Sequence, residues 1–363
     1  MNRLSDRTTR TWLTAAVTAG ILLLIAGCTS GSTVPESDDG TQQEFKVCMA
    51  TGGAGLDWMD GQGDVARAMA KLRGWDYAEL SNDNDGPTAT KNAEVFIQDK
   101  CNAVLEFNGQ PSVNPVLAAK FAAAKIPVIT FDIGQEGWYF LGIDNAKAGN
   151  AGGAALGKIA KAKWDCEPDL VLSSEAAAAG IVNDQRTGGM REGVKSVCPD
   201  IPESKFVSFE GNGLLSDAQP AARAVLASHP AAKKILVVGI NDSGVVGALQ
   251  AAQQLGRTAD IIAWGQDGSL VTGPNVNPNL AGSVFYFLEG YPVYAFTEIL
   301  DKIAAGTPPE VGDNTNNNPT VLLAPCPVTQ AQAAAIPSMA DRITKLLAAP
   351  EGETEDSLFC PVD

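Results

Sequence analysis

Carboxylate, amide, guanidinium and aromatic side chains recur in this sequence directly after short apolar runs. The residues with this placement are Asp57, Trp58, Asn108, Asp132, Asn183, Arg186, Asn241, Asp267 and Tyr286. Carboxylates accept hydrogen bonds while amides and guanidinium groups donate them. Together they can form paired hydrogen bonds with vicinal hydroxyl groups. The indole of Trp58 can cover the apolar face of a sugar ring. The set therefore predicts a binding site for a neutral, hydroxyl-rich ligand.

A second interpretation applies to each Asp and Asn taken singly. These residues often cap a helix at the junction between a strand and the helix that follows it. For one residue alone, capping and ligand binding are about equally good explanations. We expect Asp242 and Ser243 to be caps. For the other residues the cluster favours binding, because many strand ends supply hydrogen-bonding groups together.

Motifs for catalysis or cofactor binding are missing from the sequence. It has no Gly-x-Ser-x-Gly elbow, and its single histidine, His229, stands before a proline at a predicted helix end, where we expect a surface residue. The glycine-rich Thr51–Gly55 lacks the phosphate-loop and dinucleotide patterns. Asp132 and Asp267 could act as an acid/base pair, as in glycoside hydrolysis, but binding requires no raised pKa and is the simpler prediction. We expect no catalysis and no cofactor.

The elements that must position these residues alternate regularly from Phe45 to about Ala305. Predicted strands are 45–50, 76–80, 103–106, 127–131, 139–142, 169–173, 205–209, 234–239, 261–264 and 281–286. Between them lie alanine-rich stretches with helical spacing, at 65–72, 116–124, 149–162, 219–227 and 243–255. Strand, helix and strand in succession predict parallel sheets covered on both faces. Ten strands exceed one ordinary sheet, so we predict an α/β fold with two doubly wound parallel-sheet lobes joined by a hinge.

Ligands of open parallel sheets bind beyond the carboxyl ends of the strands, so two facing lobes predict one cleft. We assign 45–144 plus 287–315 to the N-terminal lobe and 145–286 plus 316–363 to the C-terminal lobe and an extension. Predicted hinges are the crossings near Gly142–Asn145, Tyr286–Tyr291 and Gly312–Pro319. Thr329 to Leu347 is predicted to be the last helix.

The N-terminus resembles an export signal. Three arginines precede an apolar run from Trp12 to Ile25, which is shorter than a bilayer span of about 20 residues. Ile25-Ala-Gly-Cys28 resembles the lipobox of bacterial lipoproteins, so residues 1–27 are the predicted signal peptide and Cys28 the lipidated residue. Residues 28–44 are too polar to fold and form a predicted tether. We expect an exported protein held on the outer face of the cell membrane.

Charge and cysteine content fit this location. The net charge of -16 gives no basic surface for nucleic acid. Apart from Cys28, six cysteines remain, which predicts disulfides with fifteen possible pairings. Order along the chain favours Cys48 with Cys101, Cys166 with Cys198 and Cys326 with Cys360. Without a Cys-x-x-Cys spacing, we expect no zinc or other metal.

The sequence resembles the periplasmic ribose- and galactose-binding proteins of ABC importers, whose lobes are shared by LacI-type repressors. The resemblance extends from about Phe45 to Ala305. It is carried by Ile126-Pro-Val-Ile-Thr-Phe-Asp132, Leu141-Gly-Ile-Asp-Asn145, Arg186-Thr-Gly-Gly-Met190, Val238-Gly-Ile-Asn-Asp242 and Gly265-Gln-Asp-Gly268. A repressor would need a helix-turn-helix before the first lobe, where this chain has a signal and a tether.

The resemblance implies a sugar or sugar alcohol held by Asp132, Arg186, Asn241 and Asp267, with help from Asn108. It also implies hinge closure and a membrane permease as partner, and we expect a monomer. Ile133, Tyr286 and the segment 55–58 depart from the ribose-binding pattern; they remove a cation and add aromatic surface, which argues against ribose. A nucleoside or signalling ligand, a sensory receptor and a surface glycosidase remain as alternatives.

Overall fold

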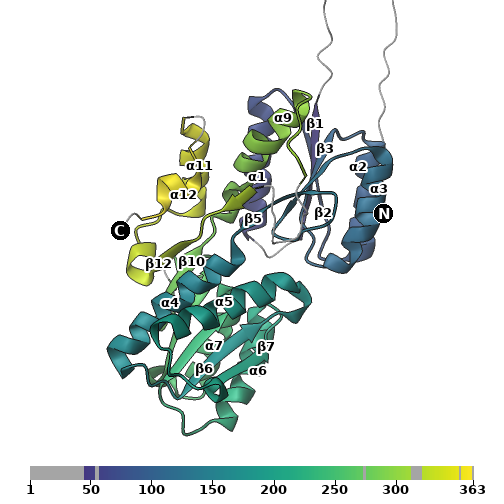
Figure 1. The fold of residues 1–363 in the computed structure, drawn as a ribbon. Coiled ribbons are helices and arrows are strands. Elements are labelled where there is room, and N and C mark those ends of the chain that lie inside the picture. Colours follow the sequence, from purple (N-terminus) through teal and green to yellow (C-terminus); the bar gives the residue numbers. More distant parts are fainter. Residues whose placement is uncertain (1–44, 54–56, 273–274, 312–320, 351–352, 362–363) are drawn as a thin grey trace, which may run out of the picture. The chain divides into compact units, whose positions relative to one another are not determined.

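The structure is a computed structural model that describes residues 45–53, 57–272, 275–311, 321–350 and 353–361. These residues belong to one compact unit, 43–363. The predicted signal peptide, Cys28, the tether and the crossing predicted at Gly312–Pro319 lie outside the described residues. Figure 1 labels the main elements.

The first sheet is entirely parallel. Its strands are β1 (Lys46–Thr51), β2 (Asp76–Ser81), β3 (Ala103–Glu106), β4 (Val128–Phe131), β5 (Tyr139–Ile143) and β11 (Val321–Leu323), in the order β11-β5-β4-β3-β1-β2. Along β1, Val47 and Met49 pack on one side of the sheet, and Cys48 and Ala50 pack on the other. Successive side chains point to opposite faces of the sheet and both faces are buried, so the sequence of the strand is a continuous apolar run.

Helices cover both faces of this sheet. One cover is made by α1 (Asp57–Leu72), the 3-10 turn η5 (Leu288–Gly290), α8 (Tyr291–Tyr294), the π-helical turn η6 (Ala295–Leu300) and α9 (Asp301–Ala304). The other cover is made by α2 (Gly86–Gln98) and α3 (Asn114–Ala124), with the short turn η1 (Pro111–Val113). Asp85 caps α2 by accepting a hydrogen bond from the Thr88 amide.

The second sheet is parallel except at one edge. Its strands are β6 (Leu170–Glu175), β7 (Phe206–Glu210), β8 (Ile235–Gly239), β9 (Ile261–Asp267), β10 (Leu280–Phe285) and β12 (Cys326–Thr329), in the order β12-β10-β9-β8-β6-β7. Only β12 is antiparallel to its neighbour, β10. The prediction of two parallel-sheet lobes, with all ten predicted strands, is confirmed, and β11 and β12 are additions to it.

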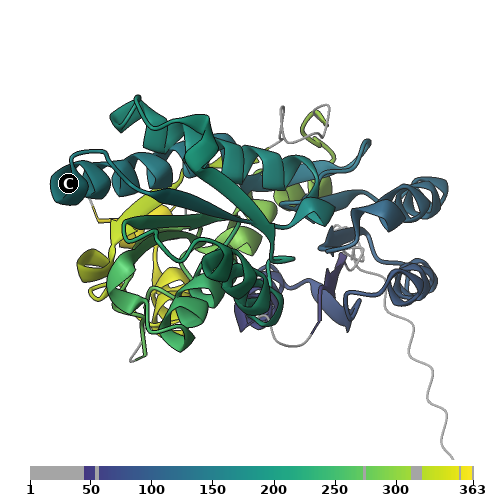
Figure 2. The ribbon, with the colours of Figure 1, turned by 90° about the horizontal axis from the view of Figure 1, so that it is seen from below.

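Two helix pairs cover the second sheet. Helices α4 (Asn145–Trp164) and α5 (Ile181–Val197) lie side by side on one face (Figure 2), and α6 (Leu215–Ser228) and α7 (Asp242–Gln254) pack on the other. Three short turns, η2 (Ala177–Ala179), η3 (Glu203–Lys205) and η4 (Thr258–Asp260), connect these elements. The α4–α5 contact is so close that a Cβ at Gly153 would lie 2.0 Å from the carbonyl oxygen of Met190.

In the described part of the chain, three segments connect the two sheets. The first lies at Asp144, between β5 and α4, and the second at Tyr286–Phe287, between β10 and η5, as the sequence predicted. The third lies between β11 and β12, because β11 pairs with β5 and β12 with β10. Residues 321–323 therefore belong to the first sheet, whereas the predicted boundary grouped them with the second lobe.

The C-terminal segment is not one helix. The predicted helix at 329–347 is wrong: β12 ends at Thr329, followed by α10 (Gln330–Ala333), α11 (Met339–Ala348) and α12 (Glu355–Phe359). Pro337 explains the interruption, since a proline lacks the amide that a continuing helix needs. Thr329 and Ser338 then cap α10 and α11 through their side chains.

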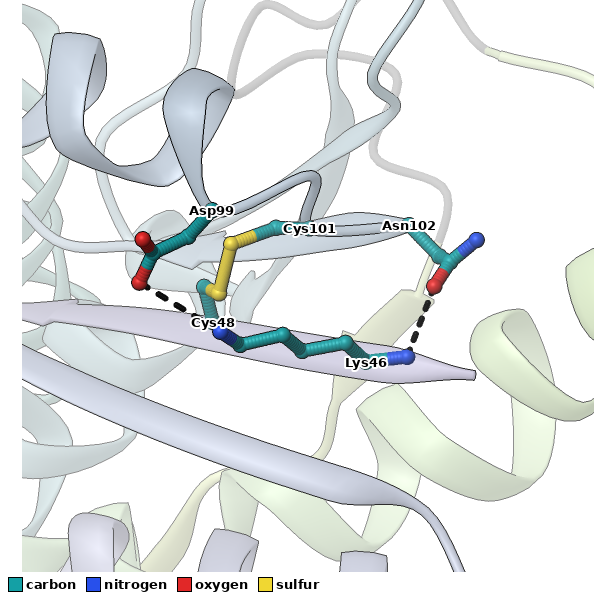
Figure 3. Close-up of a disulfide and its surroundings, with 5 residues drawn as sticks. All are labelled: Lys46, Cys48, Asp99, Cys101 and Asn102. Carbon is teal, nitrogen blue, oxygen red and sulfur yellow. Dashed lines mark hydrogen bonds and ion pairs between the residues drawn. A yellow bond between two sulfur atoms is a disulfide. The ribbon is translucent and has the colours of Figure 1, made fainter. Parts of the chain in front are cut away.

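All three predicted disulfides are present. Cys48 in β1 is bonded to Cys101, just before β3, and beside this bond the Lys46 amide donates to Asn102 Oδ1 at 2.7 Å while Lys46 Nζ pairs with Asp99 (Figure 3). Cys166, after α4, is bonded to Cys198 at the end of α5. Cys326 in β12 is bonded to Cys360, which follows α12, so the bond closes the C-terminal segment into a ring.

The last two disulfides provide a matched pair for a stability measurement. Their sequence separations are 32 and 34 residues, so the chain-entropy model gives each about 3–4 kcal/mol of stabilisation. We expect urea unfolding of Cys166→Ala/Cys198→Ala and Cys326→Ala/Cys360→Ala to show similar losses in the free energy of unfolding. A loss near zero for the second variant would mean that the C-terminal segment does not unfold together with the body.

Candidate functional site

Four of the predicted site residues come together where strands of both sheets end. Asp132 follows β4, Asp267 ends β9, Tyr286 follows β10, and Arg186 lies in the second turn of α5. Arg186 interacts electrostatically with the other three. A cation, two carboxylates and a phenol from four elements therefore form one polar cluster at the strand ends.

Arg186 is the centre of this cluster and is only 8% exposed. Its Nε donates to Asn145 Oδ1 at 2.7 Å, and one terminal nitrogen lies 3.4 Å from the carbonyl oxygen of Ile240. The guanidinium lies over the Tyr286 ring, 4.6 Å from its centroid, which adds a cation–π contact. Burial opposes the charge, yet Tyr286, Asp132 and other acidic neighbours raise the pKa of Arg186. The residue is therefore a fixed cation.

Asp132 is the acidic group of the first sheet in this cluster. Its Oδ1 accepts hydrogen bonds from the hydroxyl of Tyr291 at 3.2 Å and the amide of Ile143 at 3.4 Å. Burial raises the pKa of its carboxyl, and the positive charge of Arg186 partly offsets this effect. Its φ of 57° lies in the left-handed region, a costly conformation for a residue other than glycine.

The prediction that Asp242 caps a helix is wrong. The cap of α7 is Asn241, whose Oδ1 accepts from the Gly244 amide at 2.9 Å. Asp242 is fully buried, and its two oxygens accept from the hydroxyl of Ser283 at 2.7 Å and the amide of Leu270 at 2.9 Å. Burial, followed by the nearby charge of Asp267, raises its pKa well above the ordinary value. Asp242 thus lies behind Asp267 and holds the loop that follows β9.

Asp267 and Asn241 line the pocket beside the cluster. The pocket has a volume of about 640 Å³ and is also lined by Leu214, Phe287, Glu289 and Arg342. Asp267 Oδ1 accepts from the Ser269 amide at 2.8 Å, and burial raises the pKa of its carboxyl. Asn241 Nδ2 donates to the Gly213 carbonyl at 2.8 Å, so the side chain that faces the pocket is also rigidly held.

The remaining predicted residues have other placements. Asn183 lies inside α5 and its Oδ1 accepts from the Ala176 amide at 2.8 Å, which is a structural role. Asn108 is 1% exposed; its Oδ1 accepts from the Gln110 amide, while its buried Nδ2 has no partner among the described residues. Asp57 and Trp58 begin α1, and their side chains lie outside the described part of the structure. His229 is half-buried at the end of α6.

Sequence reasoning missed several residues of the site. Asn145 and Tyr291 hold Arg186 and Asp132, and Gln266 accepts a hydrogen bond from the Tyr286 hydroxyl. Glu106, at the end of β3, is buried and accepts from Asn82 Nδ2 at 2.8 Å. Its place two residues before Asn108, at a strand end, was the available signal. Burial raises the pKa of Glu106 to about 8.

Among the described residues, no group of three or more His, Cys, Asp or Glu side chains is placed to hold a metal ion. In the same part of the chain, no helix is both long enough and apolar enough to span a membrane.

Two α/β lobes with polar groups at the ends of their strands are the architecture of solute-binding proteins. Residues 47–304 match the model of the periplasmic binding protein domain, and the chain belongs to that family. This confirms the resemblance noted in the sequence. Membership in this family of exported binding proteins indicates a location outside the cytoplasm.

Individual relatives agree with this assignment. The chain is 32% identical over 180 residues to the L-arabinose-binding periplasmic protein of Escherichia coli K12, covering 43% of this chain and about half, 54%, of that protein. Similar solved structures include a glycerol-bound ABC transporter solute-binding protein from Mycobacterium smegmatis (20% identity, TM-score 0.65, covering 81% of this chain and 96% of that one). Another is the Caulobacter myo-inositol binding protein (16% identity, TM-score 0.65, covering 84% and 98%). The two structures establish a shared fold.

Glu106 gives the stability of the protein a measurable pH dependence. Its pKa is about 8 in the folded protein against an ordinary 4.5, so the protonated form favours folding. This stabilisation is complete below about pH 4.5 and is lost as the pH rises through about 8, by up to about 1.4 kcal/mol per pH unit. Glu106→Gln keeps the acceptor for Asn82 and cannot ionise. We therefore expect urea unfolding to show the variant gaining stability relative to the wild type between pH 5.5 and 8.5.

Glu94→Gln is the matched control for this measurement. Glu94 is exposed on α2, and its hydrogen bond from Lys120 lowers its pKa, so it stays ionised over the whole range. Its stability difference from the wild type should be flat with pH. An equally flat difference for Glu106→Gln would show that Glu106 is ionised at pH 5.5 and contradict the assignment.

Proposed function

We propose that this protein is the extracytoplasmic solute-binding lipoprotein of an ABC importer, and that it binds a sugar or sugar alcohol by hinge closure. It performs no chemistry on that ligand. The single observation that carries the proposal is the cluster of Asp132, Arg186, Asp267 and Tyr286 beside a pocket of about 640 Å³. Pockets of this size accommodate small organic ligands.

The groups at the site suit a neutral, hydroxyl-rich molecule. Asp267 and Asn241 line the pocket and can supply an acceptor and, through the second hydrogen of Nδ2, a donor, while Leu214 and Phe287 supply apolar surface. Hydroxyl groups can donate to the carboxylate and accept from the amide at the same time, while the ring or chain carbons cover the apolar wall. In this proposal Asp132, Arg186, Asn108 and Tyr286 complete the contacts, and Asp57 and Trp58 contribute from the start of α1.

The mechanism follows from the three connections between the sheets. Each is a short segment, at Asp144, at Tyr286–Phe287 and at Ala324–Pro325, so a few backbone torsions can change the angle between the lobes. A ligand that contacts both lobes stabilises the closed form by its differential affinity for that form. The closed form then delivers its cargo to a membrane permease, and a monomer suffices for this cycle.

A thermal-shift screen of the mature protein tests the ligand class. The panel contains L-arabinose, D-allose, myo-inositol, glycerol, uridine and L-glutamine. A ligand present at 100 times its Kd should add about 2.7 kcal/mol to the free energy of unfolding. We expect a raised melting temperature with at least one sugar or polyol, lost in Asp267→Asn because the pocket loses an anionic acceptor. Asp99→Asn, which removes an exposed carboxylate paired with Lys46, should keep the shift.

The other outcomes distinguish the alternatives. A shift with uridine or L-glutamine alone would keep the binding role and overturn the sugar assignment. Conversion of a glycoside substrate by the wild-type protein, abolished in Asp132→Ala, would replace the binding role with a hydrolase. No shift with any member of the panel would remove the support for a sugar-binding protein.

The lipid anchor is tested separately. Cys28 ends the lipobox-like Ile25-Ala-Gly-Cys28, and a tether of polar residues follows it. In a bacterial host we expect the wild type to incorporate a palmitate analogue and to fractionate with membranes, and Cys28→Ala to do neither. Labelling of the variant at the wild-type level would contradict the assignment of Cys28 as the anchor.

A further inference from the structure

The C-terminal helix α11 forms part of the wall of the pocket that contains Asp267. Its residues Met339 and Arg342 line the pocket together with Glu289, which belongs to η5 directly after the second connection between the sheets. The pocket thus has two polar sides, one from the strand ends of the second sheet and one from η5 and α11. The sequence motifs that carry the family resemblance do not include the second side.

Helix α11 is held in place by packing on its neighbours. It packs against α1 and η5, and a Cβ at Gly61 of α1 would lie only 3.1 Å from Met339 Sδ. The Cys326–Cys360 bond ties the end of the segment to β12, and the ring of Phe359 lies 6.3 Å from that of Phe287. Because α11 packs on α1 and η5, the side chains that it presents to the pocket are held in position.

Glu289 and Arg342 form a buried ion pair on this wall, with exposed fractions of 3% and 6%. Arg342 Nε donates to Glu289 Oε1 at 2.6 Å, and a terminal nitrogen of the same guanidinium contacts the same oxygen. Another terminal nitrogen donates to the Pro337 carbonyl at 2.9 Å. The guanidinium also lies within 6.0 Å of the ring centroids of Phe285 and Phe287.

The pair leaves one carboxylate oxygen available. Both contacts from Arg342 fall on Oε1, and Oε2 of Glu289 receives no hydrogen bond from any residue that the structure describes. A carboxylate can accept about four hydrogen bonds, so Oε2 keeps its accepting capacity. Glu289 lines the pocket, and this oxygen is therefore an acceptor available to a bound molecule. The ion pair as a whole is neutral, which suits a neutral hydroxyl donor.

We propose that Glu289 is a specificity-determining residue of the ligand pocket, with Oε2 accepting a hydrogen bond from a ligand hydroxyl. Arg342 is its positioning residue, and Met339 limits the size of the occupant on the α11 side. This inference rests on the proposed function and narrows the ligand to a neutral polyhydroxyl compound whose hydroxyls reach both Asp267 and Glu289.

Titration calorimetry of the mature protein tests the contact, with L-arabinose, D-allose, myo-inositol and glycerol as probes. Glu289→Gln should weaken the Kd of the best-bound probe by about tenfold or more, since it replaces a charged acceptor. Met339→Phe should also weaken binding, because it adds volume inside the pocket without touching the ion pair. The matched control is Glu298→Gln, an exposed glutamate of η6 paired with Lys302, which should bind like the wild type.

The double variant Glu289→Gln/Arg342→Met separates recognition from folding. Glu289→Gln alone removes the carboxylate that faces the buried guanidinium of Arg342, whereas the double variant removes both charges of the ion pair and should recover the melting temperature. If Glu289 contacts the ligand, the double variant regains stability but not affinity. A double variant that recovers the wild-type Kd would show that the pair is only structural, and would overturn the proposal.

The remaining outcomes separate this inference from the proposed function. If the wild type binds a probe, Asp267→Asn loses it, and Glu289→Gln and Met339→Phe stay within twofold of the wild type, the sugar-binding function stands and the role of Glu289 is refuted. If the wild type binds none of the probes, the sugar-binding proposal fails, and the role of Glu289 fails with it.

Discussion

The buried charge of Arg186 is the interaction on which the arrangement of the site depends. An ion in a protein interior costs several kcal/mol unless partners replace its hydration. Here the partners come from different elements: Asn145 begins α4, Tyr286 follows β10, and Asp132 follows β4 in the other sheet. Because no single element supplies enough of them, the cation and the anions are stable only when these strand ends are close together. For the same reason, a ligand that adds to or replaces the partners of Arg186 changes how strongly these strand ends are held together.

Much of the fold could be predicted because its strands are buried on both sides. Such strands are continuous apolar runs, and all ten predicted ones are present, most within one or two residues of the observed bounds. The exceptions have physical causes. Strands β11 and β12 are only three and four residues long, and β12 contains Pro327, so no long apolar run indicates either of them in the sequence. Helix α5 is mostly polar, and its glycines, needed against α4, weaken its helical pattern.

The site was predicted less completely, since position along a strand says little about hydrogen-bond partners. Ligands of parallel sheets bind beyond the carboxyl ends of the strands, and this generalisation correctly predicted that Asp132, Arg186, Asp267 and Tyr286 lie together. It could not tell that Asn183, inside α5, accepts a hydrogen bond from the amide of Ala176 before that helix, or that Asn241 and not Asp242 caps α7. Glu289 lies in the 3-10 turn η5 and Arg342 in helix α11, 53 residues further along the chain, and no local pattern indicates that they meet.

Positive φ angles mark the places where the surroundings must hold the backbone. Among the residues with such angles are Asp132 at 57°, Asp267 at 88° and Phe287 at 47°. Conformations of this kind cost about 1–3 kcal/mol and persist only when other contacts impose them. At Asp132 these contacts are Tyr291 and Ile143, and at Phe287 they are Phe285, Phe359 and Arg342.

The support at Phe287 has a consequence for the hinge. Phe287 lies in the second connection between the sheets, and two of its three supporting residues belong to the C-terminal segment closed by Cys326–Cys360. A change in the torsions of this connection must therefore break or carry along the contacts of Phe359 and Arg342. Arg342 also holds Glu289 in the pocket wall. The same side chain therefore contacts both the hinge residue Phe287 and Glu289, the residue that we propose to recognise the ligand.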